Sequence, residues 1–352
     1  MELLTITPKT HAVITGGAGF IGFQLSAKLL RAGARVTILT RHTETPQARA
    51  LVKQGAAMLS WDCASPVRLD DGGRLASAQM FYHLAADVAV TSPTLRRTNI
   101  EGTQHALDLA DRHKIPYFIY ASSIEAQGLA SDEDAPLGEA APCRPVSDYG
   151  ASKAEAEGIV TRWAESSNKK ALILRIGNIY GPGSAWFLHP CVMALIGLSP
   201  LAHVWPGLQH RRFQPLYLDD LVEGLLRASR RELTGIYNLT GEEPMSIGDY
   251  LHSLAGLIRL TDQLANIQSP WRGPEPPPSA LAPDFHYFLM GSQDRCHRLY
   301  DNARIRAEIG DYAHWPIARG LAATLSWYGR AGMLSGVLNA VGHQRGPTCT
   351  SH

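Results

Sequence analysis

Tyr149 and Lys153 are the residues whose types and spacing point most directly to chemistry. Side chains four positions apart lie on one face of a helix, one turn above each other. A phenol has a pKa of about 10 in water, and a neighbouring ammonium lowers that pKa because it stabilises the phenolate. Such a pair can exchange a proton with a substrate oxygen at neutral pH. The alternative is a chance pairing on a solvated helix, so a second signal is needed elsewhere in the chain.

A glycine-rich turn near the start of the chain is that second signal. It reads Gly16-Gly17-Ala18-Gly19-Phe20-Ile21-Gly22, after a short apolar run and before a helical pattern. Glycines at this spacing allow a tight turn and a close approach of the backbone to a pyrophosphate at the positive end of the helix. We therefore predict a dinucleotide site here. The alternative is a glycine turn that binds nothing.

The elements that must position these residues alternate along the first half of the chain. Short apolar runs occur at 11–15, 35–40, 56–60, 80–84, 116–121 and 171–176, with helical patterns between most of them. This alternation predicts an α/β fold built on a doubly wound parallel sheet with helices on both faces. Core character returns at 213–218 and 235–239. A proline-rich loop is expected at 270–283 and a final helix pair within 302–330.

Several residues follow the predicted strands at the carboxyl edge, where the ligands of such sheets bind. Ser123 could hydrogen-bond a reacting oxygen, although a serine at this place can also simply end a strand. The run His83-Leu84-Ala85-Ala86 lies where the backbone would pass close to a bound nucleotide. Asn99 would either hold a water for a proton relay to Lys153 or bond the backbone, and the sequence leaves both readings open.

Composition excludes several other classes of protein. The 33 basic and 32 acidic residues nearly balance, so no electrostatic footprint for nucleic acid exists. Five scattered cysteines without a CxxC pair fit free thiols in a reducing compartment, and we predict neither disulfides nor a metal site. The apolar stretch 187–204 is interrupted by two prolines and two histidines, and the N-terminus has no secretory pattern. We expect a soluble cytoplasmic protein without an integral membrane span.

Together these motifs resemble the extended short-chain dehydrogenase/reductase superfamily, of the NAD-dependent epimerase/dehydratase type. The resemblance extends over residues 9 to 330 and rests on the glycine motif at 16–22, Asp62, the segment 83–86, Asn99, Ser123, the YxxxK pair at 149–153, and the segments 178–183, 217–220 and 325–328. Within the superfamily, segments 118–125 and 212–217 look most like the 3β-hydroxysteroid dehydrogenase/isomerase branch.

The resemblance implies a division of the chain into two parts. Residues 1–180 would form a Rossmann-type dinucleotide-binding domain, to which 213–240 return. Residues 181–212 and 241–330 would form a smaller substrate-binding lobe, followed by a flexible tail at 331–352.

The resemblance also implies roles for single residues. Tyr149 would be the acid–base group, and Lys153 would lower its pKa and bind the nicotinamide ribose. Ser123 would orient the reacting oxygen, Asp62 would meet the adenine edge, and Asn99 would complete the catalytic set. The other cofactor contacts would come from Gly16, Gly19, Phe20, Ile21, Gly22, Arg41, Leu84, Ala85 and Ala86, and the substrate contacts, besides Ser123, from Glu125, Asn178, Trp186, Phe187 and Phe213.

The end of the second predicted strand bears on the choice of cofactor. Enzymes that use NAD usually place an acid there to accept a ribose hydroxyl, whereas this chain has Thr40 followed by Arg41. An arginine fork suits the oxygens of a 2′-phosphate. The sequence therefore favours NADP(H) as the cofactor, with NAD(H) as the alternative. The other interpretation of Arg41 is an ordinary solvated side chain that contacts no cofactor.

The substrate is the least defined part of the sequence. Apolar residues between 186 and 213 predict a pocket for a hydrophobic molecule, although the same residues also build ordinary core. The main expectation is an oxidoreductase that interconverts a hydroxyl and a ketone on a steroid-like, polycyclic or long-chain substrate. The first alternative is a nucleotide-sugar epimerase, dehydratase or reductase, in which an arginine would be expected where this chain has Phe213. A non-catalytic NADP-binding protein is the second.

The helix expected at 150–166 carries small residues that permit close packing against another helix. The resemblance implies a homodimer formed by this helix and the one near 100–113. A solvated helix of good intrinsic propensity explains the same residues equally well.

Overall fold

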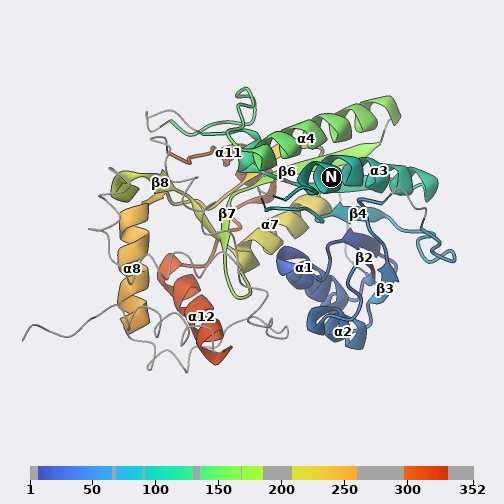
Figure 1. The fold of residues 1–352 in the computed structure, drawn as a ribbon, viewed down its shortest axis with the longest axis horizontal. Helices are drawn as coiled ribbons and strands as arrows, with labels where there is room; N and C mark the ends of the chain where they lie inside the picture. Colours follow the sequence, from blue (N-terminus) through green and yellow to red (C-terminus); the bar gives the residue numbers. More distant parts are fainter. Residues whose placement is uncertain are drawn as a thin grey trace, which may run out of the picture.

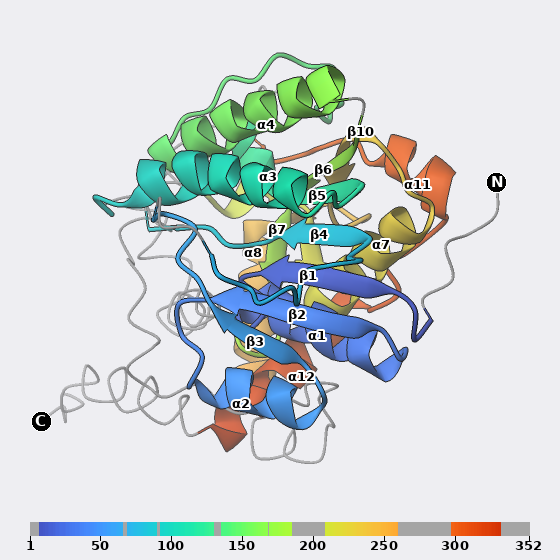
Figure 2. The ribbon, with the colours of Figure 1, turned by 90° about the vertical axis from the view of Figure 1, so that its right-hand side faces the viewer.

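A seven-stranded parallel sheet forms the centre of the computed structural model, which describes residues 7–65, 69–89, 92–129, 135–167, 169–184, 208–259 and 297–331. Its strand order is β10-β6-β5-β4-β1-β2-β3 (Figure 2). The strands are β1 (His11–Thr15), β2 (Arg35–Thr40), β3 (Ala57–Ser60), β4 (Met80–His83), β5 (Tyr117–Ser123), β6 (Lys170–Ile176) and β10 (Gly235–Leu239). The predicted fold class, a doubly wound Rossmann-type parallel sheet with a smaller C-terminal region, is confirmed.

Helices cover both faces of this sheet (Figure 1). One face packs against α1 (Phe20–Arg31) and α7 (Leu218–Arg230), and the other against α3 (Gly102–Arg112) and α4 (Asp148–Ser167). The central strand β5 serves both layers, because its odd-numbered residues from Tyr117 to Ala121 join the first core and Phe118 and Tyr120 join the second. Burial on both faces explains why the strands are nearly continuous apolar runs. Helix α2 (Pro46–Lys53) connects β2 to β3.

The register of the strands brings the carboxyl ends of β1, β4, β5 and β6 to one edge of the sheet. Thr15 pairs with His83, and Ser123 pairs with Ile176. The six strands expected in the first half of the chain are all present. β5 continues two residues beyond its expected end, so that Ser123 is the last residue of the strand itself.

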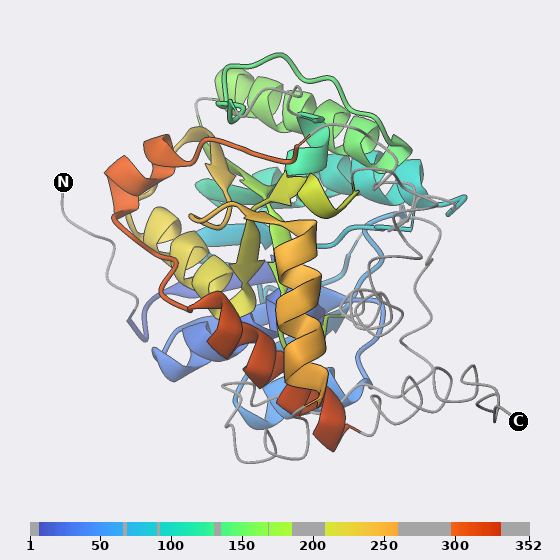
Figure 3. The ribbon, with the colours of Figure 1, turned by 90° about the vertical axis from the view of Figure 1, so that its left-hand side faces the viewer.

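The C-terminal region adds short elements beside this edge. Strand β7 (Asn178–Tyr180) pairs with β9 (Pro215–Tyr217), and β8 (Arg212–Phe213) pairs with β11 (Met245–Ser246). Helices α8 (Ile247–Arg259) and α12 (Ile317–Arg330) lie side by side next to them (Figure 3). The expected final helix pair is present as α11 (Ala303–Ile309) and α12.

Short helices also occur among the described residues. They are η1 (Arg97–Glu101), η2 (Ile124–Ala126) and η4 (Leu208–His210). The proline-rich loop expected at 270–283 and all of the expected tail except Ala331 lie outside the described residues. Among the helices that are described, none has the length and apolar character needed to cross a membrane.

Candidate active site at the carboxyl edge of the sheet

The glycine turn forms a backbone cradle between β1 and α1. Gly16 has a φ of +67°, and a Cβ there would lie 2.9 Å from the amide nitrogen of Ala85. A Cβ on Gly22 would lie 2.1 Å from the carbonyl oxygen of Gly16. Gly19 is the N-cap of α1 and offers no side-chain cap, and the first turn carries no acidic residue. The first-turn amides are therefore open to an anion, which is what a dinucleotide pyrophosphate requires.

His83 fixes the neighbouring segment Leu84-Ala85-Ala86. Its Nδ1 lies 2.7 Å from the Thr15 hydroxyl and its Nε2 lies 3.2 Å from the Thr103 hydroxyl. The same Thr15 oxygen accepts a 3.2 Å hydrogen bond from the Ala85 amide. Burial, with a smaller effect from the charge of Lys153, lowers the pKa of His83 to about 3. His83 is therefore neutral at physiological pH and acts as a brace for the backbone beside the glycine turn.

Tyr149 and Lys153 lie near the beginning of α4, as their spacing predicts. Tyr149 is half-buried, whereas the whole Lys153 side chain is buried. The Lys153 ammonium donates a 2.8 Å hydrogen bond to the carbonyl of Ala121 and lies 5.9 Å from the centre of the Tyr149 ring. It also lies 4.8 Å from the centre of the Tyr120 ring. Burial lowers the pKa of Lys153 to about 7, and the charge of Glu157 acts in the opposite direction.

Ser123 lies at the end of β5 and Asn99 lies within η1. The Ser123 hydroxyl accepts a 3.2 Å hydrogen bond from the Glu125 amide and thereby caps η2. The Asn99 amide group donates to the Asp87 carbonyl at 2.9 Å and accepts from the Asp87 amide at 2.8 Å. It also donates to the Ser152 hydroxyl at 3.0 Å, one position before Lys153. These bonds match the reading of Asn99 as a residue that binds the backbone.

Glu125 is tied to the C-terminal part of the chain. Its carboxylate forms a 2.5 Å ion pair with Arg298 and accepts a 3.3 Å hydrogen bond from the Ser147 hydroxyl. The structure thus adds Arg298 and Ser147 to the residues expected from the sequence. Arg298 is 173 positions from Glu125, and no local pattern connects the two.

The residues expected at the adenine end of the cofactor lie beyond β2 and β3. Asp62 is half-buried, and its carboxylate accepts a 3.0 Å hydrogen bond from the Ala64 amide. Burial, aided by Asp62, raises the pKa of the Cys63 thiol to about 11, while the charge of Arg41 acts against the rise. Arg41 is exposed, and the Thr40 hydroxyl before it accepts a bond from the His42 amide. The charge of Arg41 is therefore close enough to the Cys63 thiol to act on it.

The expected substrate contacts are only partly described. Asn178 begins β7 directly after the edge of the sheet, and its buried Nδ2 has no hydrogen-bond acceptor among the described residues. Phe213 packs edge-on against Tyr250, with 5.2 Å between the ring centres. Trp186 and Phe187 lie outside the described residues. An unpaired buried amide at this edge fits a site that is completed by a polar ligand.

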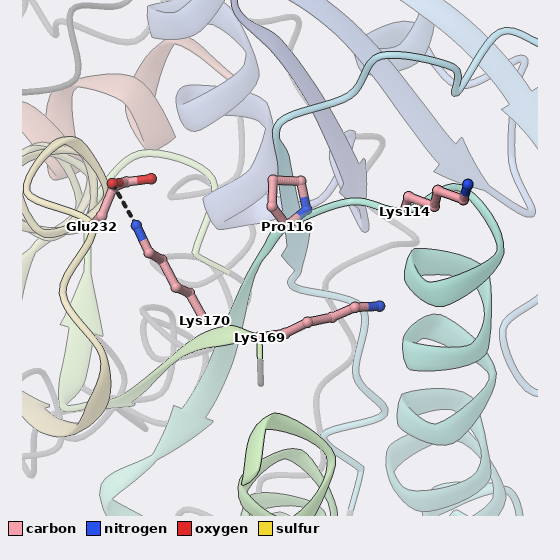
Figure 4. A pocket seen from close by; sticks show the side chains of 5 residues that line it. All are labelled: Lys114, Pro116, Lys169, Lys170 and Glu232. Atoms are coloured by element: carbon pink, nitrogen blue, oxygen red, sulfur yellow. Dashed lines mark hydrogen bonds and ion pairs between the residues drawn. The ribbon is translucent and has the colours of Figure 1, made fainter. Parts of the chain in front are cut away.

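One hollow of about 300 Å³ lies at the opposite edge of the sheet (Figure 4). It is lined by Lys114, Pro116, Lys169, Lys170 and Glu232, which lie around the amino ends of β5 and β6. Lys170 is paired with Glu232 at 2.8 Å, and Lys169 is paired with Asp111. The hollow is therefore separate from the residues described above.

Comparison with known proteins agrees with this arrangement. The sequence model of the NAD dependent epimerase/dehydratase family matches residues 12–240. A dTDP-glucose 4,6-dehydratase of Streptomyces griseus is 30% identical over 340 residues, which are 91% of this chain and 94% of the relative. A 4-hydroxy-2-methyl-3-oxo-4-farnesyl-3,4-dihydroquinoline-1-oxide ketoreductase of Stigmatella aurantiaca is 26% identical over 301 residues, which are 80% of this chain and 86% of the relative.

Solved structures show the same fold. The dTDP-glucose 4,6-dehydratase of Bacillus anthracis, solved in complex with NAD, has a TM-score of 0.70 and 17% identity, over 91% of this chain and 97% of that one. The expected similarity to the 3β-hydroxysteroid branch is not supported, because the relatives named above include a dTDP-glucose 4,6-dehydratase and no hydroxysteroid dehydrogenase. That expectation rested on two short segments, 118–125 and 212–217.

Proposed function

Because the chain belongs to the NAD dependent epimerase/dehydratase family, we propose that it oxidises a carbinol carbon of a nucleotide-linked sugar by hydride transfer, with Tyr149 as the acid–base group. One observation carries the proposal. A buried ammonium, Lys153, lies beside the phenol of Tyr149 at the same edge of the sheet as the glycine cradle. A protein that only bound a dinucleotide would have no use for this costly burial of a charge.

Each residue has a defined task in this reaction. Tyr149 as phenolate takes the proton from the sugar hydroxyl, and Lys153 stabilises the phenolate. Ser123 turns its hydroxyl toward the reacting oxygen, and the Asn178 amide donates to a polar group of the substrate. A nicotinamide dinucleotide, when bound, supplies the hydride acceptor. The glycine cradle and the open first turn of α1 hold its phosphates.

The step after oxidation separates a dehydratase from an epimerase. Dehydration requires a base that removes a proton from the carbon next to the new ketone. In the turn after Ser123, Glu125 has the one carboxylate, since its neighbours Ile124 and Ala126 are apolar and buried. The ion pair with Arg298 holds the Glu125 carboxylate in place at this turn, and we propose Glu125 as that base. Epimerisation needs no such base, only return of the hydride to the other face of the ketone.

Arg41 supports the use of NADP(H) alongside NAD(H). No carboxylate ends β2, so a 2′-phosphate meets no repulsion there, and Arg41 is exposed and free to turn toward it. We expect Arg41→Ala to weaken NADP(H) binding about tenfold and NAD(H) binding much less. Fluorescence titration with both cofactors measures this. A preference for NADH that the substitution leaves unchanged would remove Arg41 from the cofactor site.

A panel of substrates tests the proposal as a whole. Purified protein is incubated with nucleoside diphosphate hexoses, and the products are analysed by mass spectrometry. Loss of one water identifies a dehydratase, and a new isomer of unchanged mass identifies an epimerase. Glu125→Gln should abolish the first outcome and spare the second. Turnover of lipophilic ketones alone would favour the hydrophobic substrate that was the main expectation from the sequence, and turnover of nothing at all would favour a non-catalytic NADP-binding protein.

A further inference from the structure

Glu157 extends the catalytic face of α4 by one more turn. Tyr149, Lys153 and Glu157 follow one another at intervals of four, so that all three lie on one face of the helix. Glu157 is only 4% exposed and lies where α4 packs on the sheet. A carboxylate at such a depth is costly unless its oxygens are fully bonded, so its retention calls for a reason.

Two sheet residues hold this carboxylate in place. The Arg175 guanidinium from β6 donates to it from Nε at 3.0 Å and from Nη2 at 2.8 Å. The Ser122 hydroxyl from β5 donates to Oε1 at 2.5 Å. Arg175 is itself braced by the Glu139 carbonyl and the Cys143 sulfur, each at 3.2 Å. Both carboxylate oxygens are therefore satisfied, and the charge of Glu157 is fixed beside Lys153.

Lys153 and Glu157 form hydrogen bonds with two neighbouring residues of β5. Lys153 bonds the carbonyl of Ala121, and Glu157 bonds the side chain of Ser122, the next residue. We propose that Glu157 is a positioning residue whose buried carboxylate opposes the loss of the Lys153 proton that burial promotes, so that a larger share of the pair carries an ammonium beside the Tyr149 phenolate. The proposal rests on the acid–base role of Tyr149 given above.

The other ionisable groups around Lys153 are neutral or positive and do not stabilise its ammonium. His83 from β4 and Tyr120 from β5 are neutral, because burial lowers the pKa of the first to about 3 and raises the pKa of the second well above its ordinary value. Burial likewise raises the pKa of Cys63 to about 11, so its thiol is neutral. Arg175 is positive and disfavours a second cation nearby. Of the described groups that act on Lys153, Glu157 is thus the one that supplies negative charge at neutral pH.

The consequence concerns which member of the pair is deprotonated first. Burial alone favours loss of the proton from the ammonium, which would leave a neutral amine and a neutral phenol. The Glu157 carboxylate lies one turn from Lys153 and two turns from Tyr149. It stabilises the Lys153 ammonium more than it destabilises the Tyr149 phenolate, because the attraction acts over the shorter distance. The carboxylate therefore raises the share of the pair that is present as ammonium and phenolate, which is the form that takes a proton from substrate.

An optical titration tests this without any substrate. The phenolate absorbance of Tyr149 is obtained as the difference between a protein and its Tyr149→Phe counterpart, both with oxidised dinucleotide bound. In Glu157→Gln we expect the phenolate to form at a pH higher by roughly one unit or more than in the wild type. Glu155→Gln is the matched control, since Glu155 lies on the same helix but is exposed and paired with Arg96. Its titration should equal that of the wild type.

The design separates the outcomes. If Glu157→Gln does not fold because Arg175 is left unpaired, Glu157→Gln/Arg175→Gln removes both charges and should still form the phenolate at a higher pH than the wild type. An unchanged titration in either folded variant overturns the role of Glu157 and leaves the proposed function intact. Absence of sugar turnover overturns the proposed function, while the titration still reports on Glu157.

Discussion

Single residues at the edge of the sheet combine burial with charge, and Lys153 does so most clearly. It is 3% exposed, and its ammonium is bonded to a main-chain carbonyl. Such an arrangement lowers stability and serves chemistry. The buried charge beside Tyr149 leads to one prediction for activity and one for stability.

Tyr149→Phe removes the acid–base oxygen and leaves the ring in place. We expect kcat with the nucleotide sugar to fall by about 10²- to 10⁴-fold, because proton transfer loses its catalyst. The Kd for the dinucleotide should change less than about threefold, since the glycine cradle is untouched. Tyr237→Phe, on β10 at the outer edge of the sheet, serves as the control and should keep its activity. Full turnover by Tyr149→Phe would assign the chemistry to another residue.

Lys153→Met should stabilise the protein in a pH-dependent way. The pKa of Lys153 is lowered from its ordinary 10.5 to about 7, so between these values the unfolded chain binds a proton that the folded chain lacks. Stability of the wild type therefore rises with pH across this window, and the full penalty applies below about pH 7. The gain from methionine should be largest near pH 6, at most about 5 kcal/mol, and should vanish toward pH 10.

Thermal unfolding across this pH range measures the effect. Wild type and variant are compared without cofactor, since a bound dinucleotide would add its own stabilisation. A methionine variant that is equally stable or less stable than the wild type at every pH would show that the buried ammonium carries no penalty.

At the scale of elements, the turn between β1 and α1 depends on glycine for two different reasons. Gly16 needs its positive φ, and Gly22 needs the absence of a side chain, because the helix start lies directly against the Gly16 carbonyl. Close contact between helix and turn brings the first-turn amides to one point, where a pyrophosphate can meet them.

Gly22→Ala should disrupt this turn, whereas Gly158→Ala in α4 should be harmless. The new Cβ at 22 would lie 2.1 Å from a backbone oxygen, and we expect a loss of about 3 kcal/mol or more in the free energy of unfolding, together with loss of dinucleotide binding. At 158 the nearest atom is the mobile end of Arg162, at 3.2 Å, so alanine should stabilise the helix by about 0.5–1 kcal/mol. Urea unfolding of both variants measures these changes in stability. Equal unfolding midpoints for Gly22→Ala and Gly158→Ala would contradict the predicted difference.

The sequence predicts elements better than it predicts contacts between them. The six strands and the helix that carries Tyr149 follow from local periodicity, and so does the carboxyl edge to which they lead. The Glu125–Arg298 and Glu157–Arg175 ion pairs do not follow from local periodicity, because each pair connects residues from different elements and no local sequence pattern indicates the contact. Glu157 itself did carry a signal, since it continues the spacing of Tyr149 and Lys153. The expected hydrophobic substrate is not supported by the comparisons, and the apolar residues near 186–213 on which it rested fit core and pocket alike.

For the whole molecule, we propose that α3 and α4 form a dimer interface. The two helices lie side by side on one face of the sheet (Figure 2), and α4 carries Ala151, Ala154 and Gly158 at the spacing of a single helix face. None of the three is fully buried within the described chain. Their small side chains would allow a second copy to approach closely.

Ala154→Arg should convert this dimer to a monomer. The long charged side chain would occupy the space that the second copy needs. Light scattering measures the mass of the wild type and of the variant. Val52→Arg on α2 is the control, because Val52 is exposed and α2 lies far from α3 and α4 (Figure 2), and its variant should remain dimeric. A wild type that is monomeric at every concentration would refute the interface.

The central claim is that Tyr149, supported by Lys153, takes the hydroxyl proton while a nucleotide-linked sugar gives its hydride to the dinucleotide, and a single-turnover experiment tests it most directly. Protein loaded with oxidised dinucleotide is mixed rapidly with nucleoside diphosphate hexoses, and the near-ultraviolet absorbance of reduced nicotinamide is followed. We predict a rise in absorbance in the wild type that Tyr149→Phe slows by at least about 100-fold. No rise with any nucleotide sugar, together with a rise on a lipophilic alcohol, would contradict the account.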